Sequence, residues 1–342
     1  MTYAQEELIE SSATIAKVDG ATIERIASAI ANRLKSGGKF IAFGNGGSAA
    51  DAMHIAAELA GRYRMVRPGM QSIALSNIST LTAIGNDFSY EEVFERQVEG
   101  LVRSGDAVLG ISTSGNSKNV LRGMRKAKEL GALTISFSGE GGQLRHEADL
   151  ALVIPSRSTP RIQEAYLASG HIMCGLIERH VYGRKAVLID RDDTIAKDVP
   201  YCSRPEDLHL FDGVPEAIAR LNQAGYLVVV VTNQSGVSRG LFDEDALQRI
   251  HEKMKQDVEA KGGKIDAIYY CPHHPDAGCG CRKPATGMAI RAINELGLDP
   301  ARSWVIGDRE HDVEMGHRVG CRAIQVSKDL TFAEAVRRIL EE

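Results

Sequence analysis

Two aspartates separated by one residue, Asp190 and Asp192, follow a short apolar run near the middle of the chain. Two positions along an extended segment bring both carboxylates near one spot, where one attacks phosphorus and the other serves as general acid/base. Asp308 follows a later apolar run and adds an oxygen ligand for Mg²⁺, a hard cation that prefers such ligands. Thr232 and Lys283 are expected to bind and neutralise the transferring phosphoryl group. The pattern predicts phosphoryl chemistry in the second half, with Asp190 and Asp192 as its reacting carboxylates.

A cluster of thiol and imidazole side chains lies downstream, within eleven residues: Cys271, His273, Cys279 and Cys281. Three thiolates and one imidazole predict a closed tetrahedral Zn²⁺ site. Because no ligand position stays open, we expect a structural role, in which the ion holds the loop that carries Arg282 and Lys283. His274 competes with His273 as the nitrogen ligand.

Two loops rich in glycine and hydroxyl residues mark the first half, Gly44–Ser48 and the segment 111–117. Each follows an apolar run and precedes an expected helix, so that its backbone N–H groups and the helix dipole favour an anion. Serine and threonine hydroxyls complete such contacts. The two loops together predict a phosphate-binding cradle at the carboxyl ends of two parallel strands.

Two pairs of polar residues accompany these loops at helical spacing. His54 and Glu58 are four residues apart and share a helix face, while Gln163 and His171 are eight apart and lie on roughly one face. A carboxylate and a histidine beside a bound sugar phosphate meet the needs of an aldose–ketose isomerisation. One group moves a proton between C1 and C2, and the other exchanges protons with the oxygens.

The composition is that of an average globular protein, with 342 residues, 43% hydrophobic and 25% charged. This length fits two domains, and the net charge of −4 argues against a nucleic-acid-binding surface. No apolar run approaches the roughly 18 residues of a membrane helix, and the N-terminus is polar and acidic. We therefore expect a cytoplasmic protein without membrane association. The other cysteines, Cys174, Cys202 and Cys321, are expected to be ordinary thiols.

Alternating apolar runs and helical patterns predict an α/β fold with two doubly wound parallel-sheet domains. Expected strands are 39–43, 107–111, 133–137, 150–154, 186–189, 227–231, 268–270 and 304–306. Expected helices are 5–35, 49–59, 118–130, 161–181, 215–224, 243–261 and 286–296. The pattern restarts near residues 182–185, which predicts domains at 1–183 and 184–342.

Four segments of the first half resemble one family of enzymes: DAMHIAAELAGRYR (51–64), IGNDF (84–88), GISTSGNS (110–117) and RIQEAYLASGHI (161–172). They are similar to sedoheptulose 7-phosphate isomerases, which are sugar isomerase (SIS) domain enzymes of bacterial heptose synthesis, and the likeness covers most of residues 1–182. The resemblance implies a flavodoxin-like fold. It also implies a homotetramer, the usual assembly of this family, with active sites between subunits.

By the same resemblance, Glu58 and His171 are the catalytic base and acid. It implies that zinc is held by His54, Glu58, Gln163 and His171, where the ion polarises substrate oxygens. It also implies that the sugar phosphate contacts Ser48, Asp87, Ser112, Thr113, Ser114 and Ser117, with help from Arg62. Asn45, Gly46 and Gly47 of the first loop, and Gln163, are further candidates for substrate binding.

The motif Asp-Arg-Asp-Asp-Thr at 190–194, followed by Gly307-Asp308, resembles the haloacid dehalogenase (HAD) superfamily over about residues 186–330. This likeness implies a Rossmann-like fold, with Asp190 as nucleophile and Asp192 as general acid/base. It places Mg²⁺ on Asp190, Asp308 and the backbone carbonyl of Asp192, with support from Asp312. The phosphate ester is expected to contact four residues: Thr232, Asn233, Arg282 and Lys283. Asp193 departs from the pattern, because the nearest relatives have glycine there.

The zinc loop resembles two groups of phosphatases, which act on D-glycero-D-manno-heptose 1,7-bisphosphate and on histidinol phosphate. The segments VTNQSGVSRG (231–240) and YYCPHHP (269–275) are more similar to the heptose group. The short spacing before Cys279 is more similar to the histidinol group, although it also occurs among heptose phosphatases. The isomerase-like half favours a bifunctional enzyme of heptose phosphates, with sugar phosphates as small-molecule partners. The alternative is a histidinol-phosphate-type phosphatase fused to a regulatory SIS module that senses sugar phosphates.

Overall fold

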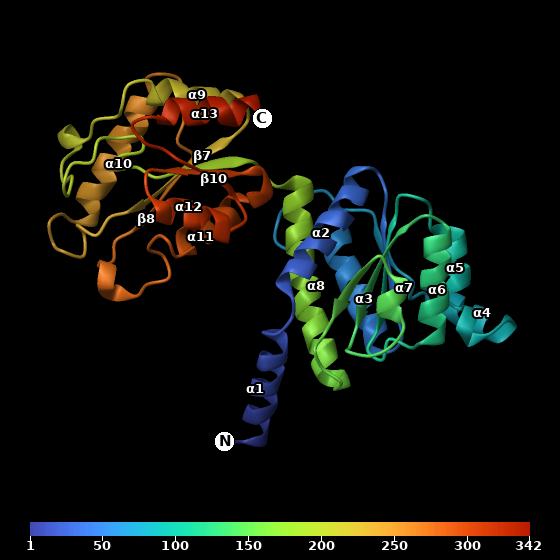
Figure 1. Ribbon diagram of the computed structural model, residues 1–342. Helices are drawn as coiled ribbons and strands as arrows, with labels where there is room; N and C mark the ends of the chain where they lie inside the picture. The colour runs from blue at the N-terminus through green and yellow to red at the C-terminus, as the bar shows by residue number, and fades with distance from the viewer. The chain divides into compact units, whose positions relative to one another are not determined.

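The computed structural model describes residues 1–342, which form two compact units, Met1–Tyr182 and Gly183–Glu342 (Figure 1). Each unit contains one five-stranded parallel sheet with helices between successive strands. The predicted α/β class with two parallel sheets is therefore confirmed. None of the helices has both the length and the apolar character that crossing a membrane requires.

The first unit has a sheet with the strand order β2-β1-β3-β4-β5, which is the flavodoxin-like order. Its strands are β1 Phe40–Gly44, β2 Ser72–Ala74, β3 Ala107–Ser112, β4 Leu133–Ser138 and β5 Leu150–Val153. The helices are α1 Tyr3–Ile15, α2 Gly20–Lys35, α3 Gly47–Ala60, α4 Ile78–Asp87, α5 Glu95–Leu101, α6 Lys118–Glu129, α7 Leu144–Glu147 and α8 Thr159–Tyr182, with a short 3₁₀ helix at Tyr90–Glu92.

Separate apolar clusters cover the two faces of this sheet, as expected for strands that are buried on both sides. Helix α2 shows how the sequence builds one of these layers. Asp19 caps its N-terminus by accepting a hydrogen bond from the backbone N–H of Ala21, and Ile23, Ile26 and Ile30 at helical spacing are all buried.

The second unit has the strand order β10-β9-β6-β7-β8, the Rossmann-like order when its strands are read in chain sequence. Its strands are β6 Ala186–Ile189, β7 Leu227–Asn233, β8 Ala267–Cys271, β9 Trp304–Gly307 and β10 Arg322–Gln325. The helices are α9 Val214–Gln223, α10 Glu244–Glu259, α11 Gly287–Leu296, α12 Glu310–Arg318 and α13 Phe332–Glu341, with 3₁₀ turns at Pro205–Asp207, Pro275–Ala277 and Pro300–Arg302.

Several short or marginal elements were not expected from the sequence. Strands β2 and β10 are edge strands of three and four residues, and neither has a fully buried side chain. Such strands lack the continuous apolar run by which the central strands are recognised. Helices α4, α5, α7, α12 and α13 were also missed, and α4 has no buried residue.

Candidate functional site

The glycine-rich loops of the first unit follow β1 and β3, the two strands at which the sheet order changes direction. In open α/β sheets, ligands bind at this switch point, beyond the carboxyl ends of the strands. Gly46 has a φ of +56°, and a Cβ on Gly47 would lie 2.0 Å from Nε2 of Gln163. The Gln163 amide of α8 therefore packs directly on the backbone of the loop, and a side chain at residue 47 would displace it.

Serine hydroxyls line the second loop. The Ser112 hydroxyl lies 3.0 Å from that of Ser117 and 3.4 Å from that of Ser114. Ser112 and Ser48 are both buried, whereas Thr113 is half-buried and Ser114 is exposed. The hydroxyls gather beside the start of α6, which begins directly after Ser117 without a side-chain cap. This arrangement offers several donors and a helix N-terminus to an anion.

Asn45 ties the two loops together. Its side-chain amide exchanges hydrogen bonds of 2.8 and 2.9 Å with the amide of Asn119 on α6, and its oxygen accepts a further bond from the Tyr90 hydroxyl at 3.0 Å. These contacts hold the loop after β1 against the helix after β3.

His54, Glu58 and His171 come together on facing helices α3 and α8. Nε2 of His54 lies 2.8 Å from Nε2 of His171 and 3.3 Å from Oε1 of Glu58. One ligand atom from each of the three lies within 4.8 Å of the others, which suits a shared metal ion. The Tyr63 ring stacks on the His171 imidazole, with centroids 5.3 Å apart and an interplanar angle of 11°.

A buried ion pair holds this geometry in place. Glu178 on α8 accepts hydrogen bonds from the backbone N–H groups of Tyr63, Arg64 and Met65 and from Nε of Arg67. The Arg67 guanidinium in turn donates to the Glu58 carbonyl at 2.9 Å and to three other carbonyls. The pair therefore fixes the end of α3 against α8. The sequence motif that ends in GRYR (61–64) covers part of this region, but the sequence did not predict the ion pair.

The structure does not bring Arg62 and Asp87 into this cluster. Both are exposed, and the Asp87 carboxylate accepts a hydrogen bond only from the neighbouring Asn86 side chain. Asp51, one turn before His54, was not expected as a polar group near the site. Burial raises its pKa to about 6, although the charge of His54 opposes the shift.

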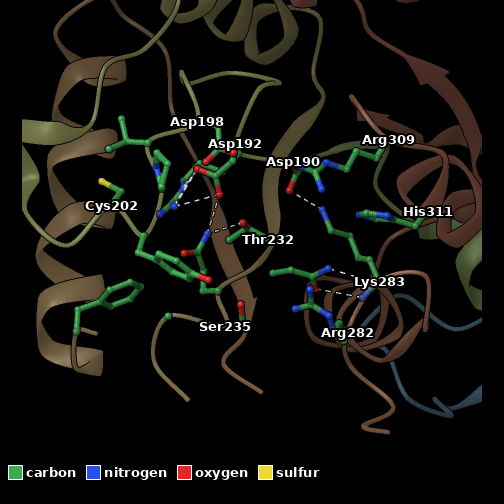
Figure 2. Close-up of a pocket in the computed structure, with 18 residues that line it drawn as sticks. Asp190, Asp192, Asp198, Cys202, Thr232, Ser235, Arg282, Lys283, Arg309 and His311 are labelled. Atoms are coloured by element: carbon green, nitrogen blue, oxygen red, sulfur yellow. Dashed lines mark hydrogen bonds and ion pairs between the residues drawn. The ribbon is translucent and has the colours of Figure 1, made fainter. Parts of the chain in front are cut away.

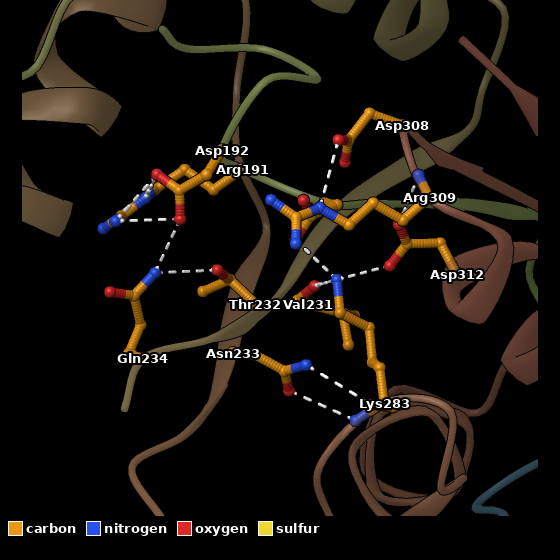
Figure 3. A network of polar contacts seen from close by, with 11 residues as sticks. Arg191, Asp192, Val231, Thr232, Asn233, Gln234, Lys283, Asp308, Arg309 and Asp312 are labelled. Carbon is orange, nitrogen blue, oxygen red and sulfur yellow. Dashed lines mark hydrogen bonds and ion pairs between the residues drawn. The ribbon is translucent and has the colours of Figure 1, made fainter. Parts of the chain in front are cut away.

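The second unit places its reacting groups at the carboxyl ends of β6 and β9, again at the switch point of the sheet. Lys283 is buried, and its Nζ lies 2.5 Å from Asp190. The same Nζ lies 2.6 Å from Asp312 and 2.8 Å from the Val231 carbonyl (Figure 3). Asn233 fixes the lysine backbone by accepting from its N–H at 3.1 Å. One cation is therefore centred between two carboxylates.

The Asp190 carboxyl has a raised pKa. Burial, reinforced by the charge of Asp312, raises its pKa to about 7, while the Lys283 ammonium pulls the value down. Further positive charge at this place would favour the ionised carboxylate, which is the nucleophilic form.

Asp192 makes its hydrogen bonds with Arg191 and Gln234 rather than with Lys283. The buried Arg191 guanidinium donates to both carboxylate oxygens at 2.9 and 3.0 Å, and the Gln234 amide donates to Asp192 at 2.9 Å (Figure 3). Gln234 also donates to the Thr232 hydroxyl at 2.9 Å. Arg191 and Gln234 were not predicted as site residues, although both lie inside the segments that carried the resemblance.

These side chains line a cavity of about 380 Å³ (Figure 2). The predicted residues Asp190, Asp192, Thr232, Asn233, Arg282 and Lys283 lie in its wall, joined by the unexpected cationic or titratable residues Arg309 and His311. The segment from Asp198 to Cys202 forms another part of the wall. The cavity thus places several positive groups around two carboxylates, as binding of a phosphate ester requires.

Three carboxylates are close enough to hold a divalent cation. Asp190, Asp308 and Asp312 each offer an oxygen within 4.8 Å of the others. Oδ1 of Asp308 is buried without a hydrogen-bond partner, an arrangement that an ion would relieve. The all-oxygen set fits Mg²⁺.

The four donor atoms of the cysteine cluster have spacings close to those of a tetrahedral zinc site. The sulfur atoms of Cys271, Cys279 and Cys281 lie 3.3 to 3.6 Å apart, and Nδ1 of His273 lies 3.2 Å from Cys281 and 3.5 Å from Cys271. A tetrahedron with Zn–S bonds of about 2.3 Å has edges of roughly 3.8 Å. His274 instead contacts Asp276.

The thiols of this cluster differ in pKa: burial raises the pKa of Cys271 to about 12, whereas that of Cys279 is lowered. Desolvation opposes the ionisation of Cys279, but hydrogen bonds from the Arg282 backbone and from Cys281 outweigh it and lower its pKa to about 6. Three thiols and one imidazole with ligand atoms within 4.8 Å of one another fit Zn²⁺, which binds thiolates.

Comparison with known families agrees with the division of the chain into two units. A family model described as SIS domain matches residues 5–139, and one described as HAD-hydrolase-like matches residues 280–341. Over 161 residues the chain is 52% identical to a phosphoheptose isomerase of Aquifex aeolicus, a stretch that covers 46% of this chain and 84% of that protein.

Two solved structures resemble separate halves of the chain. A phosphoheptose isomerase from Francisella tularensis is 32% identical with a TM-score of 0.49, covering 52% of this chain and 98% of the other. A D,D-heptose 1,7-bisphosphate phosphatase from B. bronchiseptica, complexed with magnesium and phosphate, is 33% identical with a TM-score of 0.43, covering 46% of this chain and 98% of the other.

Fold and sites together define a two-domain protein with an SIS unit and a HAD-like unit, each with a polar cluster at its switch point. Through its first unit, the chain belongs to the phosphoheptose isomerase family.

Proposed function

We propose that the chain is a bifunctional enzyme of heptose phosphate metabolism. Its first unit would interconvert sedoheptulose 7-phosphate and D-glycero-D-manno-heptose 7-phosphate, and its second unit would remove the 7-phosphate from D-glycero-D-manno-heptose 1,7-bisphosphate. Membership of the phosphoheptose isomerase family and the convergence of His54, Glu58 and His171 beside a hydroxyl-lined loop support the first activity. The grouping of Asp190, Asp192 and Lys283 in one cavity supports the second.

In the first unit, the serine-lined loops would hold the substrate phosphate as a handle at one end of the sugar. Glu58 would take a proton from C1 of the ketose and return it to C2, while His171 protonates O2 and accepts the proton from O1. Tyr63 would keep the His171 ring in the required orientation by stacking. A zinc ion held by His54, Glu58 and His171, with Gln163 nearby on α8, would supply Lewis-acid polarisation of the oxygens.

Incubation with sedoheptulose 7-phosphate alone tests this activity. We expect an aldose phosphate to appear in the NMR spectrum with the natural chain, and no conversion with Glu58→Gln. Binding of the ketose without any aldose product would instead support a sensing module. Retained turnover in Glu58→Gln would remove Glu58 from the role of base.

In the second unit, an oxygen of Asp190 would attack phosphorus as the bond to the sugar oxygen breaks, and Asp192 would protonate that leaving oxygen. Asp192 would then accept a proton from the water that hydrolyses the aspartyl phosphate, releasing inorganic phosphate. Lys283 and Arg282 would neutralise the charge of the transferring group, and the Thr232 hydroxyl would donate a hydrogen bond to it; all three line the cavity. Mg²⁺ on Asp190, Asp308 and the Asp192 carbonyl, near Asp312, would balance further negative charge.

The choice of a heptose substrate for the second unit depends on its fusion to the first. Parallel turnover of heptose 1,7-bisphosphate and histidinol phosphate by the natural chain tests it. We expect the bisphosphate to have the larger kcat/KM. A preference for histidinol phosphate would assign the second unit to the other phosphatase group while leaving the isomerase proposal intact.

We also propose a homotetramer assembled through the first unit. Two apolar side chains next to the histidines in sequence are open to solvent: Met53 is 45% and Ile172 52% exposed. A second copy would bury this apolar surface and complete the site. Sedimentation should give about four times the 37.0 kDa of one chain, and a monomer at catalytic concentration would refute the assembly.

A further inference from the structure

Asp193 has a backbone conformation that favours glycine. Its φ is +54°, in the left-handed region, and Tyr201 is the one other non-glycine residue with a positive φ. Aspartate tolerates this region better than most residues, because its short side chain makes local hydrogen bonds. The residue directly follows Asp192, yet the proposed reaction gives it no role.

The Asp193 side chain makes a contact that glycine would lack. Its Oδ1 accepts a hydrogen bond of 3.1 Å from the backbone N–H of Asp198, while its own N–H donates to the Ala196 carbonyl at 2.8 Å. Glycine would keep the second bond and the backbone conformation but would lose the first. The carboxylate therefore anchors the chain at Asp198.

Asp198 begins a wall of the phosphatase cavity. Residues 198–202 all line it (Figure 2), and the far end of this segment is secured by Cys202, whose side chain is buried in the apolar core of the second unit. Tyr201, within the wall, has the other positive φ. With the near end held by Asp193, the wall is fixed at both ends.

The hydrogen bond of Asp193 orders the cavity wall, whereas its negative charge disfavours an anionic substrate. Burial raises the pKa of Asp198, and the charges of Asp192 and Asp193 raise it further. Asp193 thus adds negative potential next to a cavity that takes an anionic ester, which by itself weakens binding. A benefit to substrate binding must come from the hydrogen bond.

We propose that Asp193 is a specificity-determining residue, which orders the 198–202 wall through its bond to Asp198 and so favours esters with a large sugar phosphate leaving group. This role rests on the proposed phosphatase activity of the second unit. A small aryl phosphate would reach the reacting carboxylates without needing the wall, whereas a sugar bisphosphate would extend along it.

Asp193→Gly and Asp193→Asn separate the bond from the charge. We expect Asp193→Gly to lower kcat/KM for heptose 1,7-bisphosphate about five- to tenfold, with p-nitrophenyl phosphate turnover changed less than about twofold. Asp193→Asn keeps the acceptor and should behave as the natural chain or slightly better. Glycine suits the backbone at residue 193, so the first variant is expected to fold.

Amide hydrogen exchange provides a readout that does not depend on the substrate. Exchange at Asp198 should be faster in Asp193→Gly and unchanged in Asp193→Asn. Equal losses on both esters, identical behaviour of the two variants, or unchanged exchange in Asp193→Gly would each overturn the proposal. If the natural chain fails to hydrolyse the bisphosphate, the proposed function fails, and the exchange experiment still decides whether Asp193 holds the wall.

Discussion

Glu178→Gln should destabilise the first unit more than any surface change. The Glu178 side chain is fully buried and that of Arg67 is 2% exposed. Oε1 accepts from the Tyr63 N–H and from Nε of Arg67, and Oε2 accepts from the Arg64 and Met65 N–H groups. In either amide orientation, the glutamine NH₂ would face two donors, and the guanidinium would lose its counter-charge.

The expected loss of unfolding free energy follows from the burial of this ion pair. Removing one partner of a buried ion pair costs about 3–5 kcal/mol, because the remaining charge is left uncompensated. The matched control is Glu147→Gln, which breaks the Arg125–Glu147 pair, whose side chains are 50% and 30% exposed. An exposed pair contributes roughly 0–1 kcal/mol.

Urea unfolding measures both variants in the full chain. Circular dichroism follows both units, whereas fluorescence of Trp304, the single tryptophan, reports on the second unit. We expect Glu178→Gln to move the first-unit transition to lower urea and leave the fluorescence transition unchanged. A loss under about 1 kcal/mol, equal to that of the control, would refute the view that this pair anchors α3 to α8.

Three further predictions concern the second unit. Burial, with the charge of Arg191, lowers the pKa of His251 to about 3, so between pH 6.5 and 3 the unfolded chain binds a proton that the folded chain does not. Stability of this unit should then fall by about 1.4 kcal/mol per pH unit as the pH drops through that window, and acid titration of His251→Phe should lack this contribution. Lys283→Met should lower phosphatase kcat about a hundredfold or more by leaving two carboxylates without their cation, with isomerase turnover as the control. Cys279→Ser should lower the zinc content by one ion per chain and reduce the melting temperature of this unit; an unchanged metal content would contradict the assigned ligand set.

The central strands and both switch points were predictable because buried parallel strands appear as apolar runs that end in chemically distinctive loops. Strands β1, β3, β6 and β9 all have this character, and Gly46, Ser112, Asp190 and Asp308 lie at or just after their carboxyl ends. The edge strands β2 and β10 lack it, since one face or end of each is open to solvent.

The positioning residues were harder to predict, because their roles depend on contacts between segments far apart in sequence. Glu178 accepts hydrogen bonds from residues more than a hundred positions earlier, and no local pattern marks it as a loop anchor. Arg191 lies between the two reacting aspartates, but only the folded chain shows that it clamps Asp192. The helical spacing of His54 and Glu58 fixed their shared face, whereas their meeting with His171 required the packing of α3 on α8.

A reciprocal assay tests most directly whether one chain holds two separate catalytic sites. Glu58→Gln and Asp190→Asn should each be supplied with sedoheptulose 7-phosphate and, separately, with heptose 1,7-bisphosphate. We predict that Glu58→Gln loses aldose formation and still releases phosphate, and that Asp190→Asn shows the opposite pattern. Loss of both activities in either variant, or retention of the activity that its substitution should abolish, would contradict the account.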